Sequence, residues 1–367
     1  MAENTKIQWA THTFNPWRGC TKVAPGCANR YAEKQSKRNP GTLGVWGPNG
    51  SRVVASEAMW RQPVAWNRDV EATVEVWKDD RPRVFCASLA DVFEDWQGSV
   101  VRHDGCTMWE CKGCSAWTDG ALPTVQANPP SCRNCGQILR QSRLELAYAR
   151  ARLFRLIDAT PNLDWLLLTK RPENVSRMWS PRHDGYFAQQ SAPPQKPYTG
   201  HRPNVWLGTS IACQDDADRD VPELLTCRDL VSKLFLSIEP LIGPVDISRW
   251  LGPQSEGQWM NVVECGHRSS EYGINWVIVG GESGTNARPC DVAWIRSIVK
   301  QCRAAGVPVF VKQLGAVPEC RCDEGGWQRA ADGTCNDNSC RRVKLLDPKG
   351  GDPAEWTEDL RVREVPT

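Results

Sequence analysis

The chain lacks a long hydrophobic run, a strong excess of either charge and an apolar leader at its start. Its 45 Lys and Arg residues against 43 Asp and Glu residues leave a net charge of +2, so overall charge gives no reason to expect nucleic acid or an anionic membrane as a partner. Apolar runs such as 165–168 and 276–279 are far too short to span a bilayer. The polar start MAENTKIQW argues against a secretory signal. We therefore expect a soluble, cytoplasmic protein that does not enter a membrane.

Cysteine and tryptophan are abundant instead. The chain has 17 cysteines and 18 tryptophans, beside seven phenylalanines and five tyrosines. Dense disulfides are typical of small exported domains, whereas 367 residues with 40% hydrophobic content can bury a large core. Metal binding is therefore the better interpretation of the cysteines. For most tryptophans we expect packing in the core and on helix surfaces, because the indole combines a large apolar area with one donor.

Short apolar runs alternate with helix-like segments along most of the chain. Such continuous runs fit strands that are covered on both faces, and the intervening helices favour parallel pairing. The clearest helices are expected over Ser142–Asp158 and Asp291–Ala305. These units predict an α/β fold with a parallel (β/α) barrel, complete or partial. The expected strands are 83–88, 165–170, 204–210, 233–240, 275–283 and 307–313, with a seventh near 7–15.

Polar residues follow the apolar part of each expected strand. In parallel (β/α) units the carboxyl ends of the strands meet at the face where active sites are built. We therefore expect a common site there, with Lys170, Arg171, Glu239 and Lys312 as candidates for binding a substrate. The three basic residues among them could hold an anionic substrate such as a nucleotide. Alternatively, these residues lie in solvated loops, cap helices or form salt bridges that only stabilise the packing. Further polar residues at the same end are Ser88, Asp91, Thr169, Thr209, Ser210, Ser237, Glu282, Ser283 and Gln313.

A cysteine-rich insert at 96–140 interrupts this alternation. Cys111 and Cys114 form one C-x2-C pair, and Cys132 and Cys135 form a second pair after 17 intervening residues. Two such pairs supply four thiolates to a tetrahedral zinc ion with no open position, which predicts a structural, zinc-ribbon-like module. Scaffolding is its expected role, and the spacing leaves contact with a nucleic acid or a protein open.

A second cysteine-rich stretch follows the last expected strand. The spacing of its cysteines allows a second zinc ion, and Cys265 or His267 could take the place of one of these ligands. The chain would then divide into 1–95, the first part of the barrel with an N-terminal cysteine loop; the insert at 96–140; 141–317, the remainder of the barrel; and a C-terminal extension and tail at 318–367. The candidate ligands in the extension are Cys320, Cys322, Cys335 and Cys340.

Cys20 and Cys27 lie in a loop after the first expected strand, in FNPWRGCTKVAPGCANRYAE. A sequence C-x6-C-x2-C-Y-A-E would supply three thiolates to an iron–sulfur cluster whose fourth iron binds S-adenosylmethionine (SAM), the source of a radical on reduction. Here the third position is Arg30, and a guanidinium is a poor iron ligand. Two ordinary cysteines in a Gly- and Pro-containing loop are the alternative interpretation.

Several segments resemble a widespread, largely uncharacterised family of phage and prophage proteins. They are IQWATHTFNPWRGCTKVAPGCANRYAE, RVFCASLADVF, WLLLTKRPENV, VWLGTSI, FLSIEPL, WVIVGGESG and FVKQLG, covering most of 5–315, with a further match in the tail at 345–366. Members of that family resemble radical SAM barrels and usually have a third cysteine where this chain has Arg30.

The resemblance implies a barrel fold, the cytoplasm of a bacterial host, and Cys20 and Cys27 as cluster ligands. It also makes Gly280, Gly281 and Glu282 candidates for contacting SAM, since glycine permits close backbone approach. This turn follows a late strand, whereas radical SAM enzymes usually place their glycine-rich contact after the second strand.

Two functions follow from these patterns. The first is a radical-SAM-like protein that modifies a nucleotide, nucleic acid or protein, with its competence in question because of Arg30. The alternative is a non-catalytic barrel with a decayed cluster site that binds nucleic acid or a phage or host protein. The expected cofactors are structural zinc and, for the first function, an iron–sulfur cluster with SAM. A hydrolase built on Asp91, Glu239 or Glu282 finds no supporting nucleophile–base spacing.

Overall fold

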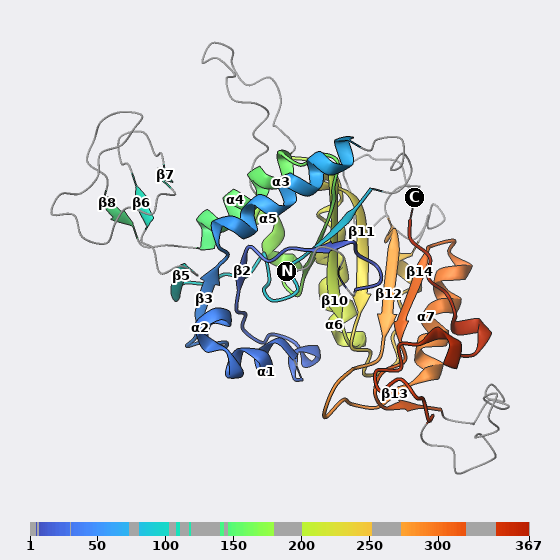
Figure 1. The fold of residues 1–367 in the computed structure, drawn as a ribbon. Coiled ribbons are helices and arrows are strands. Elements are labelled where there is room, and N and C mark those ends of the chain that lie inside the picture. Colours follow the sequence, from blue (N-terminus) through green and yellow to red (C-terminus); the bar gives the residue numbers. More distant parts are fainter. Residues whose placement is uncertain are drawn as a thin grey trace.

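Seven parallel strands form a curled sheet at the centre of the fold (Figure 1). The computed structural model describes residues 5, 7–29, 31–72, 81–102, 108–110, 117–118, 140–142, 146–179, 200–251, 273–320 and 343–366. Each strand of the sheet pairs in parallel with the strand that follows it along the chain, as in a (β/α) barrel. The strands are β1 (His12–Thr13), β4 (Arg83–Cys86), β9 (Asp164–Thr169), β10 (Arg202–Ile211), β11 (Val231–Ile238), β12 (Trp276–Gly280) and β14 (Val309–Gln313).

The sheet is a half barrel and not a closed one, because β1 and β14 do not pair with each other among the residues that the structure describes. The C-terminal tail covers the outer edge of β14, where Val311 donates to the Val362 carbonyl and Glu364 donates to the Val309 carbonyl. This coverage leaves fewer unpaired backbone groups at an exposed sheet edge.

Amphipathic helices cover the convex face of the sheet. They are α3 (Glu57–Ala72), α4 (Leu146–Asp158), α6 (Gln214–Leu225) and α7 (Val292–Ala304). Their buried residues form one large apolar cluster with the alternate residues of the strands that point outward, among them Val84, Leu167, Leu207 and Val277. The capping Asp expected before α7 is present, since the Asp291 side chain accepts from the backbone N–H of Ala293.

Aromatic side chains fill much of the concave face. Trp9, Phe85, Trp206, Phe235, Trp276 and Phe310 belong to a separate buried cluster. Trp9 lies 4.6 Å from the Phe85 ring and 6.2 Å from the Trp276 ring, so it joins β4 to β12 across the curled sheet. The Phe235 ring occupies the space beside Gly208, where an added Cβ atom would lie 2.5 Å from it.

Smaller elements surround this frame. A three-stranded sheet joins β2 (Trp17–Arg18), β3 (Ser51–Val54) and β5 (Ser99–Arg102), and α1 (Tyr31–Arg38) with α2 (Pro40–Leu43) precedes β3. In the insert, β6 (Met108–Glu110) pairs antiparallel with β7 (Trp117–Thr118) and β8 (Arg140–Ser142). After β9 come a 3₁₀ turn at Pro172–Asn174 and α5 (Val175–Met178), and β13 (Cys290–Asp291) pairs with β15 (Pro318–Glu319).

The expected α/β fold is confirmed, and all seven expected strands are present. Helix α7 begins at Val292, one residue after its predicted start. Helix α4 begins at Leu146, and Ser142, its predicted start, belongs to β8. None of the described helices is long and apolar enough to cross a membrane.

Several predicted residues lie outside the described part of the chain. They are Arg30, Cys111, Cys114, Cys132, Cys135, Cys265, His267, Cys322, Cys335 and Cys340.

Candidate functional site

The cysteine loop, residues 19–29, follows β1 and crosses the carboxyl edge of the sheet. Both thiols are enclosed, since Cys20 is 4% exposed and Cys27 is 0% exposed. Pro25–Cys27 forms a single 3₁₀ turn. A Cβ atom added to Gly26 would lie 3.2 Å from the Cβ of Ala212 and 3.5 Å from Nζ of Lys170. The turn therefore packs directly against the ends of β9 and β10.

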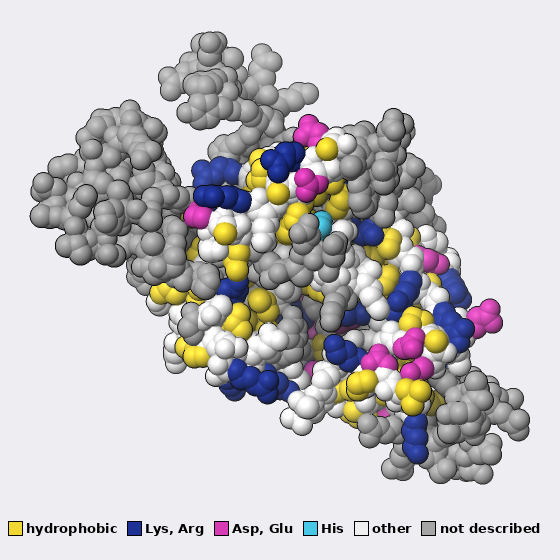
Figure 2. All heavy atoms as spheres, viewed as in Figure 1, with side chains coloured by type: hydrophobic (Ala, Val, Ile, Leu, Met, Phe, Trp, Pro, Cys, Tyr) yellow, Lys and Arg dark blue, Asp and Glu magenta, His cyan; other side chains and the backbone are white. Residues whose placement is uncertain are grey.

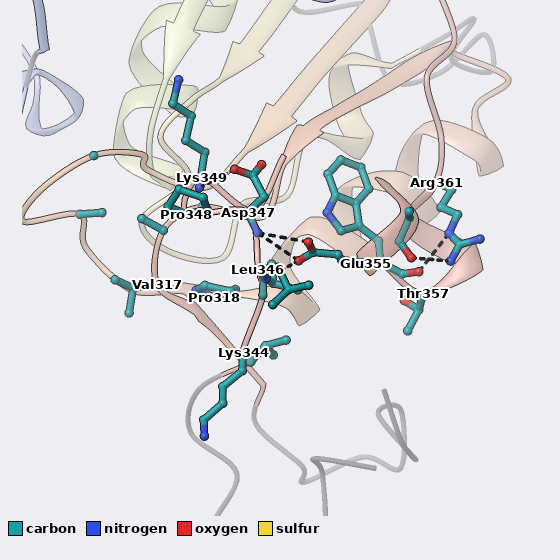
Figure 3. Close-up of a pocket in the computed structure, with 18 of the residues that line it drawn as sticks. Val317, Pro318, Lys344, Leu346, Asp347, Pro348, Lys349, Glu355, Thr357 and Arg361 are labelled. Carbon is teal, nitrogen blue, oxygen red and sulfur yellow. Dashed lines mark hydrogen bonds between the residues drawn. The ribbon is translucent and has the colours of Figure 1, made fainter. Parts of the chain in front are cut away.

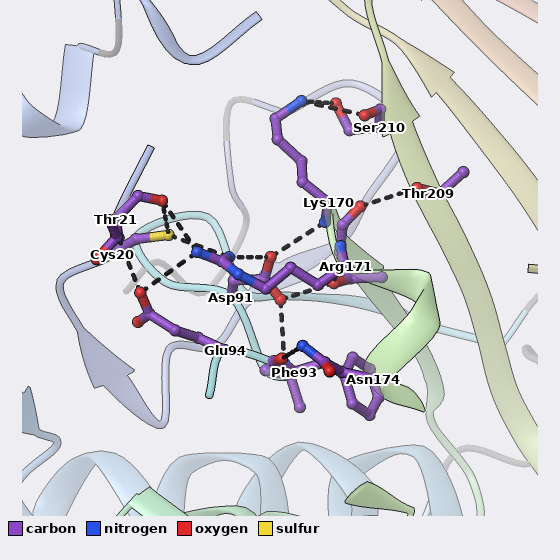
Figure 4. A network of polar contacts seen from close by, with 12 residues as sticks. Cys20, Thr21, Asp91, Phe93, Glu94, Lys170, Arg171, Asn174, Thr209 and Ser210 are labelled. Atoms are coloured by element: carbon purple, nitrogen blue, oxygen red, sulfur yellow. Dashed lines mark hydrogen bonds and ion pairs between the residues drawn. The ribbon is translucent and has the colours of Figure 1, made fainter. Parts of the chain in front are cut away.

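Arg171 anchors the first half of the cysteine loop (Figure 4). Its Nη1 lies 3.7 Å from Sγ of Cys20 and donates to Oδ2 of Asp91 at 2.8 Å. Its Nη2 donates to the Thr21 carbonyl at 3.0 Å and lies 3.4 Å from Oε1 of Glu94. Burial alone would lower the pKa of this guanidinium, but Asp91, Cys20 and Glu94 raise it overall. Arg171 is therefore a fixed cation between the loop and β9.

The two carboxylates beside Arg171 are bound from several sides. Asp91 accepts from Oγ1 of Thr169 at 2.7 Å, and Glu94 accepts from the backbone N–H of Thr21 at 2.8 Å. Glu94 also accepts from Nε and Nη2 of Arg52 at 2.7 and 2.8 Å. Arg52 is completely buried. Because each buried charge has a partner, the network can hold the start of the cysteine loop firmly in place.

A second ion pair anchors the far end of the loop. Arg288 binds both carboxylate oxygens of Glu282 at 2.8 Å and donates to the Pro25 carbonyl at 3.0 Å. The Asn29 amide donates to Oε2 of Glu282 at 3.1 Å. Burial alone would raise the pKa of Glu282, but the hydrogen bonds from Arg288 and Asn29 hold it below its usual range. Glu282 thus connects the loop to the end of β12.

Four polar side chains form a row on the concave face beneath the cysteine loop. Lys170 donates from Nζ to Oγ of Ser210, whose hydroxyl is within 3.4 Å of the Glu239 carbonyl. Nζ of Lys312 lies 3.1 Å from Oε2 of Glu239. The Lys312 side chain is 31% exposed and that of Glu239 is 13% exposed. The structure therefore brings together Lys170, Glu239 and Lys312, three of the four candidate binding residues. The fourth, Arg171, holds the cysteine loop, and substrate binding by these residues stays a prediction.

Glu239 has one carboxylate oxygen without a hydrogen-bond partner among the residues that the structure describes. This atom, Oε1, is buried, and a Cβ atom added to Gly280 would lie only 3.0 Å from it. An unsatisfied buried acceptor costs free energy that a donor would recover. The row consequently has two cationic groups and one carboxylate that can accept a further hydrogen bond.

Close packing of two strands accounts for Gly280 and Gly281. A Cβ atom at Gly281 would lie 2.2 Å from the Leu314 carbonyl oxygen, and one at Gly280 would lie 3.0 Å from the Gln313 carbonyl oxygen. Only glycine fits at position 281 between β12 and the end of β14, and a side chain at position 280 would be tight. Contact of this turn with SAM stays a prediction, but the glycines need no ligand to explain them.

The thiols of the cysteine loop do not fit a three-thiolate cluster. The loop contains two cysteines, and the third position of the motif is Arg30. Sγ of Cys20 already lies against the guanidinium of Arg171. Within the described ranges, no three His, Cys, Asp or Glu side chains are grouped so that they could hold a metal ion. The zinc ligands predicted in the insert and extension fall outside those ranges, except for Cys320, which is buried.

Several residues of the site were not predicted from the sequence. Arg52, Glu94, Arg288 and Asn29 hold the cysteine loop, but their partners are distant in the sequence, as in the pair between Arg52 and Glu94. The one local signal was the acidic run after β4, in LADVFEDW, of which only Asp91 was singled out.

A cavity of about 1540 Å³ lies away from this row (Figure 3). It is bordered by the loop at 284–287, by 315–318 and by the tail at 343–361. Glu355 accepts there from the backbone N–H groups of Leu346 and Asp347. We assign no function to the cavity.

Comparison with known proteins gives one match. A family model described as "Protein of unknown function (DUF5131)" matches residues 4–111 and 139–340. The unmatched residues between these segments, 112–138, contain three of the four cysteines of the predicted zinc insert. No curated protein matches the chain, and no solved structure does.

Proposed function

We propose that this chain, which belongs to the DUF5131 family of proteins of unknown function, is a radical-SAM-like half barrel that binds a ligand at the carboxyl edge of its sheet. In this proposal the chain has lost the third cluster thiolate, so it does not assemble a full cluster on its own cysteine loop. The observation that carries the proposal is the position of that loop, which packs at Gly26 against Lys170 and Pro240, beside the row formed by Lys170, Ser210, Glu239 and Lys312.

The arrangement of the site supports ligand binding. The carboxyl edge of a parallel (β/α) sheet is where such folds usually bind ligands. Lys170 and Lys312 would attract an anionic group, such as the phosphate of a nucleotide. Oε1 of Glu239 would accept from a hydroxyl or amino group of the same ligand. An enclosed loop held by two ion-pair anchors would order one side of the site before the ligand binds.

The second part of the proposal, that the chain does not assemble a full cluster, rests on the missing third thiolate. Iron–sulfur clusters of this type are held by cysteine thiolates, and a guanidinium at position 30 adds positive charge without a ligand atom. No reaction step is assigned to a cluster here. The barrel, the loop and the Tyr-Ala-Glu that follows at 31–33 are what would remain of an ancestral enzyme.

Iron binding by the Arg30→Cys variant tests the proposal. After anaerobic treatment with iron and sulfide, we expect little stable iron on the parent chain and about four irons per chain on the variant, with cluster absorbance in the visible range. Arg30→Ala is the matched control, because it removes the guanidinium without adding a thiol and should stay low in iron.

Two outcomes would contradict the proposal. If Arg30→Cys binds no more iron than the parent, the cysteine loop does not descend from a cluster loop. If the parent itself binds about four irons, the chain is competent to hold a cluster and the proposed loss is wrong. Adding Cys27→Ala to the Arg30→Cys variant should remove the gained iron, which excludes binding elsewhere in the chain.

A further inference from the structure

Helix α1 presents a basic, polar surface beside the cysteine loop. Its exposed residues are Lys34, Gln35, Lys37 and Arg38, and Figure 2 shows Lys and Arg side chains gathered over this helix. The eight residues of α1 include three basic residues and one acidic residue, which is a net charge of +2. This equals the net charge of the whole chain. Helix α1 is therefore a locally basic element in a nearly neutral chain.

The single acidic group of α1 is already neutralised. Oε2 of Glu33 lies 2.8 Å from Nζ of Lys22, and its Oε1 lies 3.8 Å from Nζ of Lys37. Lys22 extends the basic surface onto the cysteine loop, with 48% of its side chain exposed. The side chain of Lys37 is 76% exposed, so its ammonium group can reach a ligand while it stays near Glu33. A surface of this kind favours a partner with several negative charges.

A partly exposed indole adjoins the basic helix. Val45 is 56% exposed, and Trp46 beside it is half-buried, in the segment that follows α2. Oγ of Ser36 in α1 donates to the Gly44 carbonyl, and Gly47 donates to the Cys20 carbonyl. These bonds hold the segment that contains Trp46 between helix α1 and the cysteine loop. We call the following residues the α1 surface: Lys22, Lys34, Lys37, Arg38, Val45 and Trp46.

We propose that the α1 surface binds single-stranded nucleic acid. Basic side chains that follow the phosphate backbone, next to an aromatic ring on which a base can stack, are the usual elements of single-strand binding. Every exposed side chain that the structure describes on α1 is polar, so the helix lacks the apolar face that a membrane-bound helix needs. The surface does not include the row at the carboxyl edge, and its test can therefore succeed when the iron test fails.

The probe is a fluorescein-labelled single strand of about 15 nucleotides, followed by fluorescence anisotropy at several salt concentrations from about 50 mM upward. Lys37→Gln with Arg38→Gln should weaken binding most strongly at the lowest salt, because the two substitutions remove two phosphate contacts. The slope of log K against log salt should also fall by about 1.4, at about 0.7 for each lost contact on a single strand. Trp46→Phe, which keeps an aromatic ring, should bind nearly as the parent does, whereas Trp46→Ala should bind about tenfold or more weakly.

The matched control is Lys300→Gln with Arg303→Gln on α7. These two residues are also basic, helical and exposed, and they lie outside the α1 surface. This variant should bind as tightly as the parent. Lys37→Arg with Arg38→Lys keeps both charges and should also bind normally, which separates charge from an effect on folding.

Four results would overturn the proposal. They are no binding to the single strand at the lowest salt, equal weakening by the α7 control, an unchanged affinity of the Lys37 and Arg38 variant, and tighter binding to the matching duplex than to the single strand. Unchanged affinity would mean that these basic residues only stabilise the C-terminal end of the helix dipole.

Discussion

Nη1 of Arg171 lies 3.7 Å from Sγ of Cys20, so a strand-end guanidinium contacts a cysteine of the loop after β1. The contact joins parts of the chain that are 151 residues apart. Asp91 and Glu94 hold the same guanidinium from β4's side of the sheet. The cysteine loop therefore depends on charges that the barrel itself supplies.

Arg171→Met should lower the free energy of unfolding by about 3–5 kcal/mol. The substitution leaves the buried carboxylates of Asp91 and Glu94 with one cationic partner fewer. Urea unfolding followed by circular dichroism measures the loss. Arg177→Met is the matched control, because Arg177 pairs with Asp95 at the surface with 59% of its side chain exposed, and it should cost under about 1 kcal/mol. Equal losses would show that the Arg171 network is not acting as buried ion pairs.

Gly208→Ala should destabilise the chain by about 1–3 kcal/mol, since the new methyl group would overlap the Phe235 ring. Gly243→Ala is the control, because nothing lies within 4 Å of its added Cβ atom. The midpoint of urea unfolding compares the two variants. When added to Gly208→Ala, Phe235→Leu should restore part of the lost stability, because the smaller side chain leaves room for the new methyl group. The same substitution in the parent should not raise the stability. Absence of such coupling would place the strain elsewhere.

Two buried thiols should make the protein less stable at alkaline pH. Burial raises the pKa of both Cys290 and Cys302 to about 12, well above the ordinary value of about 8.5. Above about pH 8.5 the thiols therefore ionise in the unfolded chain first. The free energy of unfolding then falls as pH rises toward about 12, by up to about 1.4 kcal/mol per pH unit for each thiol. Cys290→Ala with Cys302→Ala should show a shallower fall between about pH 8.5 and 10 in urea unfolding. Parallel pH profiles of parent and variant would contradict this.

Cys111→Ser with Cys132→Ser should remove about one zinc per chain, because each substitution takes a thiolate from a different C-x2-C pair. Antiparallel strands β6 and β7 immediately flank the first pair, and β8 follows the second, which suits a zinc-ribbon-like module. Zinc content by atomic emission is the measurement. Cys213→Ser, at the start of α6, is the control and should leave the zinc content unchanged. Unchanged zinc after the double substitution would exclude the insert as its site.

The strands could be predicted because both faces of the sheet are buried. Leu166 lies in the concave cluster and Leu167 in the convex one, so a continuous apolar run is required. The candidate row was predictable for a related reason. Lys170, Glu239 and Lys312 follow apolar runs that must end at the same edge of a parallel sheet.

The anchors of the cysteine loop could not be predicted in this way. Glu94 meets Arg52 and Arg171 only after three segments of the chain have folded together. No local period or spacing connects positions that are 42 and 77 residues apart. Whether the barrel closes could not be predicted from local sequence either, because closure depends on the pairing of β1 with β14.

The aromatic cluster around Trp9 and Trp276 limits where a ligand of the row can bind. Because these rings pack together on the concave face, the described residues leave little room beneath the row, and a ligand proposed for it would rest on aromatic side chains. The carboxyl edge, where the Pro25–Cys27 turn packs beside Lys170, is then the side on which the proposed ligand would bind. Loosening the Arg171 or Arg288 anchor of the cysteine loop should therefore alter the affinity for that ligand.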